Sequence, residues 1–328
     1  MCAFADALAL RAIMDASRQS RLAELVSQRD VAGLAAFGDE LLAYSTSAPV
    51  QGEALLADWL IALRALPPNS ELRERVTRIA ARYESKALGP SPEPHPALSA
   101  RVPIFDVRSQ ARGTLRSWQR AENIAKASEA LADGKLDASA IADSQAIAQA
   151  ISDAPILQLA ALRASARVLP TQATAILARR LADPDLYALL FAAPVDEFVL
   201  RALDDAPAVL APVDARRVLA VAAQRPELAS AATLSMRSLL TMNELLECLD
   251  DPGRGGSCAQ LLARREDAAT LQALIARARR GDEEIGTRRA LLALLWNGSP
   301  GARSALHDFA DDGALSATLR AEVTRWLH

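Results

Sequence analysis

Apolar residues recur along most of this 328-residue chain at the spacing of an amphipathic α-helix. Within Ala54–Leu66 they fall at i, i+4, i+7, i+8 and i+11, which places them on one helical face. Asn69 then offers an N-cap for a second helix over 71–88, after a short Pro-Pro-Asn turn. The pattern predicts an antiparallel helical hairpin in this part of the chain.

The helical pattern stops at Gly89–Ile104, a segment that holds five of the 17 prolines. Each proline removes a backbone donor and restricts the residue before it, so we expect no helix across this segment. We interpret it as an extended linker, and a proline-rich ligand for a partner's aromatic groove is the functional alternative. The chain then divides into an N-terminal helical unit (1–88), a Pro-rich linker (89–104) and a longer helical array (105–328).

Beyond the linker, turn signals recur at intervals of roughly 15 to 25 residues. Asp133-Gly134, Asp183-Pro184 and Asn297-Gly298 are examples. Helices of about 9 to 15 residues between such turns are too short to be stable alone and must pack on neighbours. The spacing predicts an array of helical hairpins.

Two stretches near the C-terminus align with each other. They are "TRRALLALLW", which begins at Thr287, and "GARSALHDFADDGALSATLRAEVTRWL", which begins at Gly301. Placing Arg289 over Arg320 aligns the apolar residues that follow. Acidic residues precede each arginine, at 282–284 in the first case and at 311 and 312 in the second. The stretch "DARRVLAVAAQ" (214–224) has a similar pattern. The chain therefore resembles the HEAT-repeat family, most clearly over 282–327.

This resemblance implies an all-α protein whose array is a right-handed α-solenoid of antiparallel helical hairpins. In HEAT repeats an acid in the turn and an arginine early in the second helix form a ladder, so Arg289 and Arg320 are expected at structural ladder positions. The resemblance implies a non-enzymatic scaffold or adaptor for a protein partner. HEAT-like lyases and nucleic-acid repair enzymes, which use a groove carboxylate, supply the alternative. The apolar run Ala290–Trp296 fits a helix packed between neighbours on every side.

Composition agrees with a helical protein. Hydrophobic residues make up 51% of the chain and aromatic residues only 4%, so alanine and leucine, both strong helix formers, dominate. Only three of the 37 basic residues are lysine, a bias associated with bacteria of high GC content. The net charge of −3 gives no general attraction for nucleic acid, and acids interleave with the arginines of 264–289. We therefore expect no nucleic-acid groove.

Candidate chemistry is sparse. His95, His307 and His328 form no metal-binding pair. His307 beside Asp308 is a weak alternative for a catalytic base, because the side chains of adjacent helical residues point in different directions.

The turn "DDPGRGGSC" could hold an anion, but it lacks the lysine and spacing of a P-loop. We therefore interpret it as a hairpin turn with Ser257 as N-cap. The sequence predicts no catalytic residue, cofactor, metal or small-molecule substrate. Among the tryptophans, Trp118 is the one expected to be exposed.

Cys248 and Cys258 bracket this glycine-rich turn. In an antiparallel hairpin their Cα atoms can approach within the roughly 4.4–6.8 Å that a disulfide requires, and two buried thiols are the alternative. Cys2 remains as an ordinary thiol, or as a lipid-attachment residue if a leader is removed. No apolar stretch reaches the roughly 18 residues of a membrane span, and the N-terminus lacks a signal-peptide pattern. We expect a soluble protein, and both cytoplasm and periplasm remain open.

Overall fold

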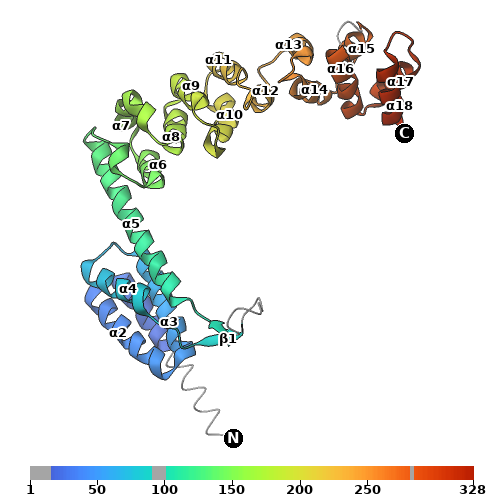
Figure 1. The fold of residues 1–328 in the computed structure, drawn as a ribbon. Helices are drawn as coiled ribbons and strands as arrows, with labels where there is room; N and C mark the ends of the chain where they lie inside the picture. The colour runs from blue at the N-terminus through green and yellow to red at the C-terminus, as the bar shows by residue number, and fades with distance from the viewer. Residues whose placement is uncertain (1–15, 91–100, 281–283) are drawn as a thin grey trace. The chain divides into compact units, whose positions relative to one another are not determined.

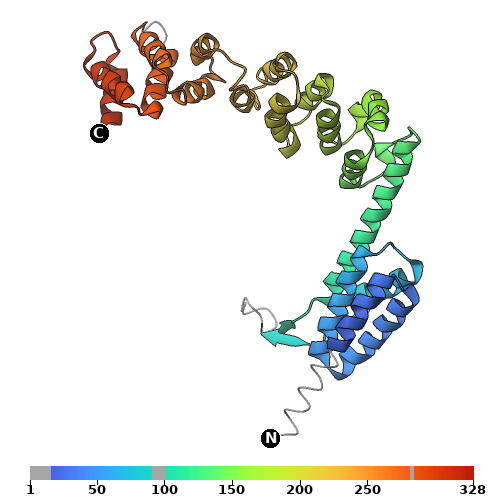
Figure 2. The same ribbon diagram turned by 180° about the vertical axis from the view of Figure 1, so that it is seen from behind.

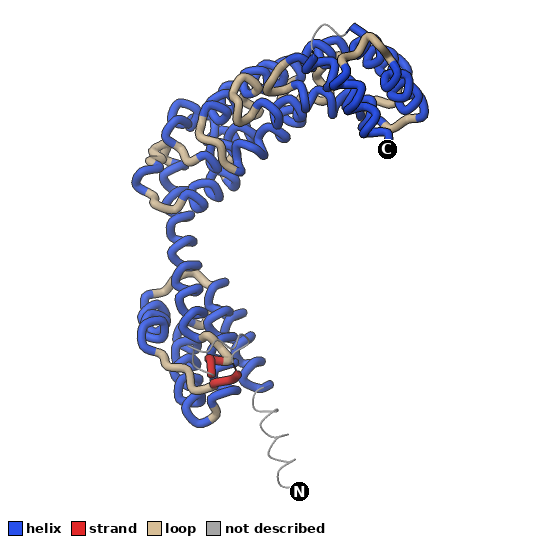
Figure 3. Tube along the Cα trace, turned by 45° about the vertical axis from the view of Figure 1, so that its right-hand side comes forward, coloured by secondary structure: helices blue, strands red, loops and turns tan. Residues whose placement is uncertain are grey.

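A computed structural model describes residues 16–90, 101–280 and 284–328 of the chain (Figure 1). Helices account for nearly all of its regular structure, which confirms the all-α class (Figure 3). The chain forms two compact units, Met1–Glu129 and Ala130–His328. The boundary between them lies inside α5 (Val107–Ala132), and each unit is described separately below.

The first unit packs several helices around one apolar core. Residues 16–28 are helical and precede α2. The elements that follow are α2 (Val31–Ser47), α3 (Pro49–Ala62), η1 (Leu63–Ala65), α4 (Ser70–Arg82), β1 (Leu88–Pro90), β2 (Arg101–Pro103) and α5. The predicted N-cap of α4 is confirmed, because the Asn69 side chain accepts hydrogen bonds from the backbone N–H groups of Glu71 and Leu72.

Two tryptophans fill the core of the first unit. Trp59 and Trp118 are fully buried, and each indole N–H donates to a carbonyl: Trp59 to Leu34 at 3.1 Å, and Trp118 to Leu63 at 3.0 Å. The expectation that Trp118 is exposed is therefore wrong. Its charged neighbours two residues away lie on the opposite, exposed face of α5, and the buried indole N–H is satisfied by a carbonyl.

The described ends of the Pro-rich segment pair with each other. β1 and β2 form a short antiparallel ladder in which Leu88 lies opposite Pro103, while residues 91–100 lie outside the described residues. Val107 and Ala111, which follow the segment, pack into the same core as Trp59. The first unit thus continues through the segment to Glu129, whereas the sequence analysis placed a linker at 89–104 and began the array at 105.

A buried carboxylate fixes the chain that leads into β1. Glu53 on α3 is fully buried and accepts hydrogen bonds from the backbone N–H groups of Lys86 at 2.6 Å and Ala87 at 3.1 Å. The Ser85 hydroxyl donates to the other carboxylate oxygen. These three donors replace the hydrogen bonds to water that the carboxylate loses when it is buried. Glu53 therefore holds residues 85–87 against α3.

The second unit consists of short helices in succession. Its elements are η2 (Ala138–Ala140), α6 (Ser144–Asp153), α7 (Ile156–Ala161), η3 (Leu162–Val168), α8 (Thr171–Leu181), α9 (Pro184–Ala192), α10 (Glu197–Val209), α11 (Pro212–Ala222), α12 (Ala229–Ser235), α13 (Met242–Glu247), η4 (Cys248–Asp250), α14 (Gly255–Ala263), α15 (Ala268–Arg280), α16 (Glu284–Asn297), α17 (Pro300–Asp311) and α18 (Ala317–Leu327).

Helices of the second unit pack on near neighbours in sequence. Contacts join α8 to α9 and α10 to α11, and also join helices two apart, such as α6 to α8, α8 to α10, and α14 to α16 (Figures 1 and 2). No helix of the unit can bury its apolar face alone, so each packs that face against neighbouring helices.

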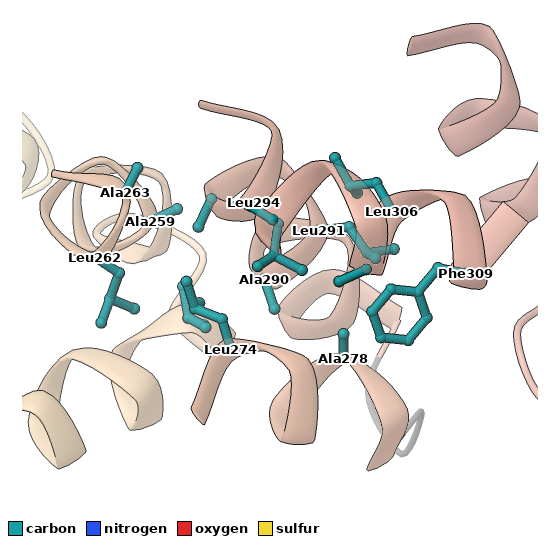
Figure 4. Packing of buried hydrophobic residues seen from close by; sticks show 14 of the residues in the cluster. Ala259, Leu262, Ala263, Leu274, Ala278, Ala290, Leu291, Leu294, Leu306 and Phe309 are labelled. Carbon is teal, nitrogen blue, oxygen red and sulfur yellow. The ribbon is translucent and has the colours of Figure 1, made fainter. Parts of the chain in front are cut away.

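The C-terminal helices bury the apolar run of α16. Leu291 and Leu294 lie among side chains of α14, α15 and α17, including Leu274 and Phe309 (Figure 4). The expectation of a helix covered on all sides fails at one position, because Trp296 is 50% exposed. Trp296 lies in the last turn of the helix, where fewer neighbours remain to cover it.

Candidate functional site

Arg289, a predicted ladder residue, reaches back from α16 to the turn between η4 and α14. Its guanidinium donates to the carbonyls of Leu249 at 2.8 Å, Asp251 at 2.6 Å and Pro252 at 3.2 Å. These are carbonyls that a helix end leaves without an intrahelical partner. Arg289 therefore stabilises the preceding turn through backbone oxygens, whereas the resemblance implies an acidic partner.

The close approach of Arg289 depends on a glycine. A Cβ built on Gly255 would overlap both the Arg289 guanidinium and the Leu249 carbonyl oxygen. Any side chain at this position would displace the guanidinium from the carbonyls that it binds. The first glycine of α14 is thus part of the Arg289 contact, and the sequence analysis assigned the glycines of this turn only a role in a flexible hairpin.

A related contact, between the C-terminal ends of two helices, recurs elsewhere in the second unit. In each case a side chain at the C-terminal end of one helix donates to the last carbonyls of the helix two before it. A cation there also compensates the negative end of the helix dipole. The donors and acceptors are Arg180 to Ser152 (2.5 Å) and Ala154 (2.7 Å), Arg225 to Phe191 and Ala193, and the Asn297 amide to Ala263 (3.0 Å).

Arg320, the second predicted ladder residue, makes no such contact within the described residues. Its side chain is half-buried on α18, and no hydrogen bond or ion pair joins its guanidinium to another described residue. The acids at 282 and 283, which the resemblance places near the ladder, lie outside the described residues. The structure therefore gives Arg289 and Arg320 different surroundings.

Cys248 and Cys258 are joined in a disulfide with their Cα atoms 6.1 Å apart. Cys248 begins η4, and Cys258 is the fourth residue of α14. Ser257 is not the N-cap that the sequence analysis expected, because α14 begins at Gly255. The Ser257 hydroxyl instead lies 2.7 Å from the hydroxyl of Ser230.

A hollow of about 410 Å³ opens beside this disulfide. Cys248 forms part of its wall, together with two arginines and three acids from α11, α13 and the turn before α14. The remaining lining residues are Arg216, Ala220, Thr233, Met236, Leu240, Glu244, Glu247, Asp251 and Arg254.

Apolar side chains also gather on the outer surface of α7 and η3. Leu157 is 89% exposed, Val168 69% and Ile156 59%. The three alanines at 160, 161 and 164 lie exposed between them. We call these six residues the α7 face. The sequence analysis did not identify it, although the apolar residues around both sides of this short helix were a visible signal.

Ala164 of the α7 face lines a hollow of about 320 Å³ between η3 and α9. Arg167 and Leu189 line this hollow and also a second one of about 240 Å³. Arg167 is exposed and forms no ion pair with another described residue, whereas the nearby Arg163 pairs with Asp183 at 2.6 Å. The surface beside the apolar face is therefore positively charged at Arg167.

Two carboxylates that are nearly or fully buried are occupied by structural contacts. Glu53 holds residues 85–87, and Asp183 pairs with Arg163 while it caps α9 through the Asp185 N–H. His307, the weak candidate for a base, is exposed on α17 beside the exposed Asp308.

In the described parts of the chain, histidine, cysteine and acidic side chains do not come together as a group that could hold a metal ion. Among the same residues, no helix combines the length and apolar character needed to cross a membrane. His95 and Cys2 lie outside the described residues. Comparison of this chain with protein-family models, curated proteins and solved structures finds no match.

Proposed function

We propose that this chain is a non-enzymatic scaffold that binds a protein partner. The α7 face carries this proposal, because three large apolar side chains there are between 59% and 89% exposed. Single exposed apolar residues are ordinary on protein surfaces, whereas several on two consecutive helices, here α7 and η3, are typical of an interaction site.

We further propose that the second unit is an α-solenoid of HEAT-like hairpins. Packing between helices one and two apart in sequence supports this arrangement, because repeat proteins make contacts mainly between successive repeats. The recurring contact from a helix end to the carbonyls of the helix two before it also supports it. Arg289 is a structural residue of the same unit, whereas Arg320 makes no such contact with a described residue.

The proposed partner presents an amphipathic helix with acidic residues at the edge of its apolar face. Leu157 and Val168 would pack against the apolar side of such a helix, and Arg167 would pair with an acid beside it. The neighbouring hollow at Leu189 is large enough to accept one apolar side chain of the partner. This role uses no catalytic group, and the contacts of Glu53 and Asp183 favour it over an enzyme with a groove carboxylate.

Site-specific photo-crosslinking in the native host tests the proposal. A photoreactive residue replaces Leu157, and the matched control places it at Val213, which is 80% exposed but lies on α11. We expect one defined heterologous protein to crosslink from position 157 and not from position 213. The purified partner should then bind the Leu157→Asp variant about 30-fold more weakly, the loss typical of a hot-spot residue.

Three results would contradict the scaffold proposal. They are the absence of any crosslink from position 157, equal crosslinking from both positions, and unchanged affinity in Leu157→Asp. A crosslink to a second copy of this chain would show self-association in place of a heterologous partner.

A further inference from the structure

The disulfide of the second unit is open to solvent on one side only. Cys248 is half-buried and forms part of the wall of the 410 Å³ hollow. Cys258 is fully buried among the C-terminal apolar residues and does not line the hollow. A small molecule in the hollow therefore contacts Cys248 and not Cys258.

Charged groups of both signs surround this accessible sulfur. Arg254 pairs with Asp251 at 2.6 Å, and Arg216 pairs with Glu244 across the hollow. Each guanidinium has five N–H donors, so both keep donors for a further acceptor. Glu247 is exposed and carries no ion pair or hydrogen bond to another described residue. The hollow thus offers donors for carboxylates and one carboxylate for a cation.

We propose that this hollow binds a small thiol that carries both carboxylate and ammonium groups, and that the bound thiol reduces the Cys248–Cys258 disulfide. The guanidinium groups of Arg216 and Arg254 bind the carboxylates of the thiol compound. Glu247 binds its ammonium group. Binding holds the thiol sulfur beside Cys248, on the open side of the bond.

The reaction is a thiol–disulfide exchange in two steps. The thiolate of the first small molecule attacks the Cys248 sulfur and forms a mixed disulfide, while the bond to Cys258 breaks and Cys258 leaves as a thiolate that takes up a proton. A second thiolate then attacks the sulfur of the bound small molecule and releases Cys248. Two thiols are oxidised to one small-molecule disulfide, and their two electrons reduce the protein disulfide to two thiols.

The position of Cys258 favours the direction of this exchange. It is the fourth residue of the nine-residue helix α14, and side chains in a helix lean toward its N-terminus. The positive end of the helix dipole opposes the cost that burial places on a thiolate there, and Cys258 is the sulfur that leaves because only Cys248 lines the hollow. The small thiol therefore attacks Cys248, and the buried Cys258 is released.

The turn between the two cysteines keeps other attachments after reduction. Arg289 binds three of its carbonyls, and Arg277 pairs with Asp250 at 2.5 Å. These contacts hold the turn close to its oxidised position. We therefore expect reduction to be reversible without unfolding of the second unit.

Glutathione is the probe for the first test. The full-length oxidised protein is mixed with glutathione under anaerobic conditions, free thiols are blocked with N-ethylmaleimide, and peptides are mapped by mass spectrometry. We expect the glutathione adduct on Cys248 and a blocked thiol on Cys258. An adduct mainly on Cys258, or on both cysteines equally, would overturn the proposal. Two free thiols in protein prepared under oxidising conditions, or no reduction at all, would do the same.

The second test examines recognition by the charged groups. Rates per thiolate are compared for glutathione and for 2-mercaptoethanol, which carries no charged group besides its thiolate. We expect Arg216→Gln to slow the glutathione reaction about threefold, the size of one exposed ion pair, and to leave the 2-mercaptoethanol rate unchanged. Arg217→Gln is the matched control, because Arg217 lies on the same helix but outside the hollow. Equal effects of the two variants would refute recognition by the hollow.

Discussion

A single guanidinium fixes the turn between η4 and α14. Arg289 approaches three carbonyls of this turn because Gly255 leaves it room. An arginine in this contact contributes more than a surface ion pair, because its partners are backbone oxygens that the helix end leaves without donors. Arg320 is the natural comparison, since it is also half-buried but forms no such contact with a described residue.

We expect Arg289→Ala to lower the free energy of unfolding by about 1.5–3 kcal/mol, the range for hydrogen bonds to a charged group. For Arg320→Ala we expect a change within about 0.5 kcal/mol, as for an ordinary surface substitution. Urea denaturation followed by circular dichroism measures both variants. Equal losses in the two variants would mean that the carbonyl contacts of Arg289 add nothing.

Tyr187 gives a residue-scale prediction about pH. Burial, with a smaller contribution from the negative charge of Asp205, raises the pKa of Tyr187 from its ordinary value of 10.0 to about 12. Its hydroxyl has no hydrogen-bond partner among the described residues. Between pH 10 and about 12 the folded state keeps a proton that the unfolded chain loses, so the free energy of unfolding falls as pH rises.

Tyr187→Phe removes this proton and the unpaired hydroxyl. We expect the variant to match or exceed the wild-type stability at pH 8, and its loss of stability between pH 10 and 11.5 to be smaller than that of the wild type. Urea denaturation at the three pH values measures this difference. If both proteins lose the same amount, Tyr187 is not the group that titrates.

At the scale of elements, the segment between α4 and β1 is held by a side chain from another helix. Residues 85–87 have no helical hydrogen bonds of their own, and the Glu53 carboxylate supplies the acceptors that they lack. The position of this short extended segment, and through it the start of β1, therefore depends on one buried acid on α3.

We expect Glu53→Ala to destabilise the first unit by about 3 kcal/mol or more, because buried donors lose their acceptor. Amide hydrogen exchange at Lys86 and Ala87 should accelerate in the same variant. Asp58→Ala is the control on α3, because Asp58 is exposed and partial burial already raises its pKa, so its removal relieves a cost. Unchanged exchange at Lys86 in Glu53→Ala would contradict the assignment.

Local features were predictable from the sequence wherever they depend on neighbouring residues. The Asn69 cap and the all-helical content follow from residues a few positions apart. Trp118 was misjudged because its flanking charges are local, whereas its burial depends on carbonyls more than fifty residues away. Ser257 was misjudged because the Asp251 carboxylate accepts hydrogen bonds from the N–H groups of Gly253 and Arg254, so that α14 begins at Gly255, earlier than expected. The α7 face was missed because exposure depends on which neighbours are absent.

At the scale of the whole molecule, the two compact units meet inside α5. Each has its own apolar core, with Trp59 and Trp118 in the first and with Leu291 and Phe309 in the C-terminal part of the second. Separate cores are expected to unfold as separate cooperative units. The disulfide lies in the second unit alone, so its reduction should affect that unit selectively.

Two reporter variants follow these units separately, one that retains Trp59 and one that retains Trp296 as its single tryptophan. We expect different urea midpoints for the two fluorescence signals. Reductant should lower the stability seen by Trp296 by about 3 kcal/mol, the chain-entropy value for a short loop, and leave the Trp59 transition unchanged. Coincident transitions that both respond to reductant would show one cooperative core.

The contacts of Arg180, Arg225 and Asn297 with the helix two before each of them also constrain how this array can change in evolution. Donor and acceptor both lie at C-terminal helix ends, so the contact requires two helices that run in the same direction. Deletion of one helix would reverse every helix that follows and carry the donor to the wrong end. Deletion or duplication of a pair keeps donor and acceptor at the same end, so related chains should differ in length by whole pairs of helices.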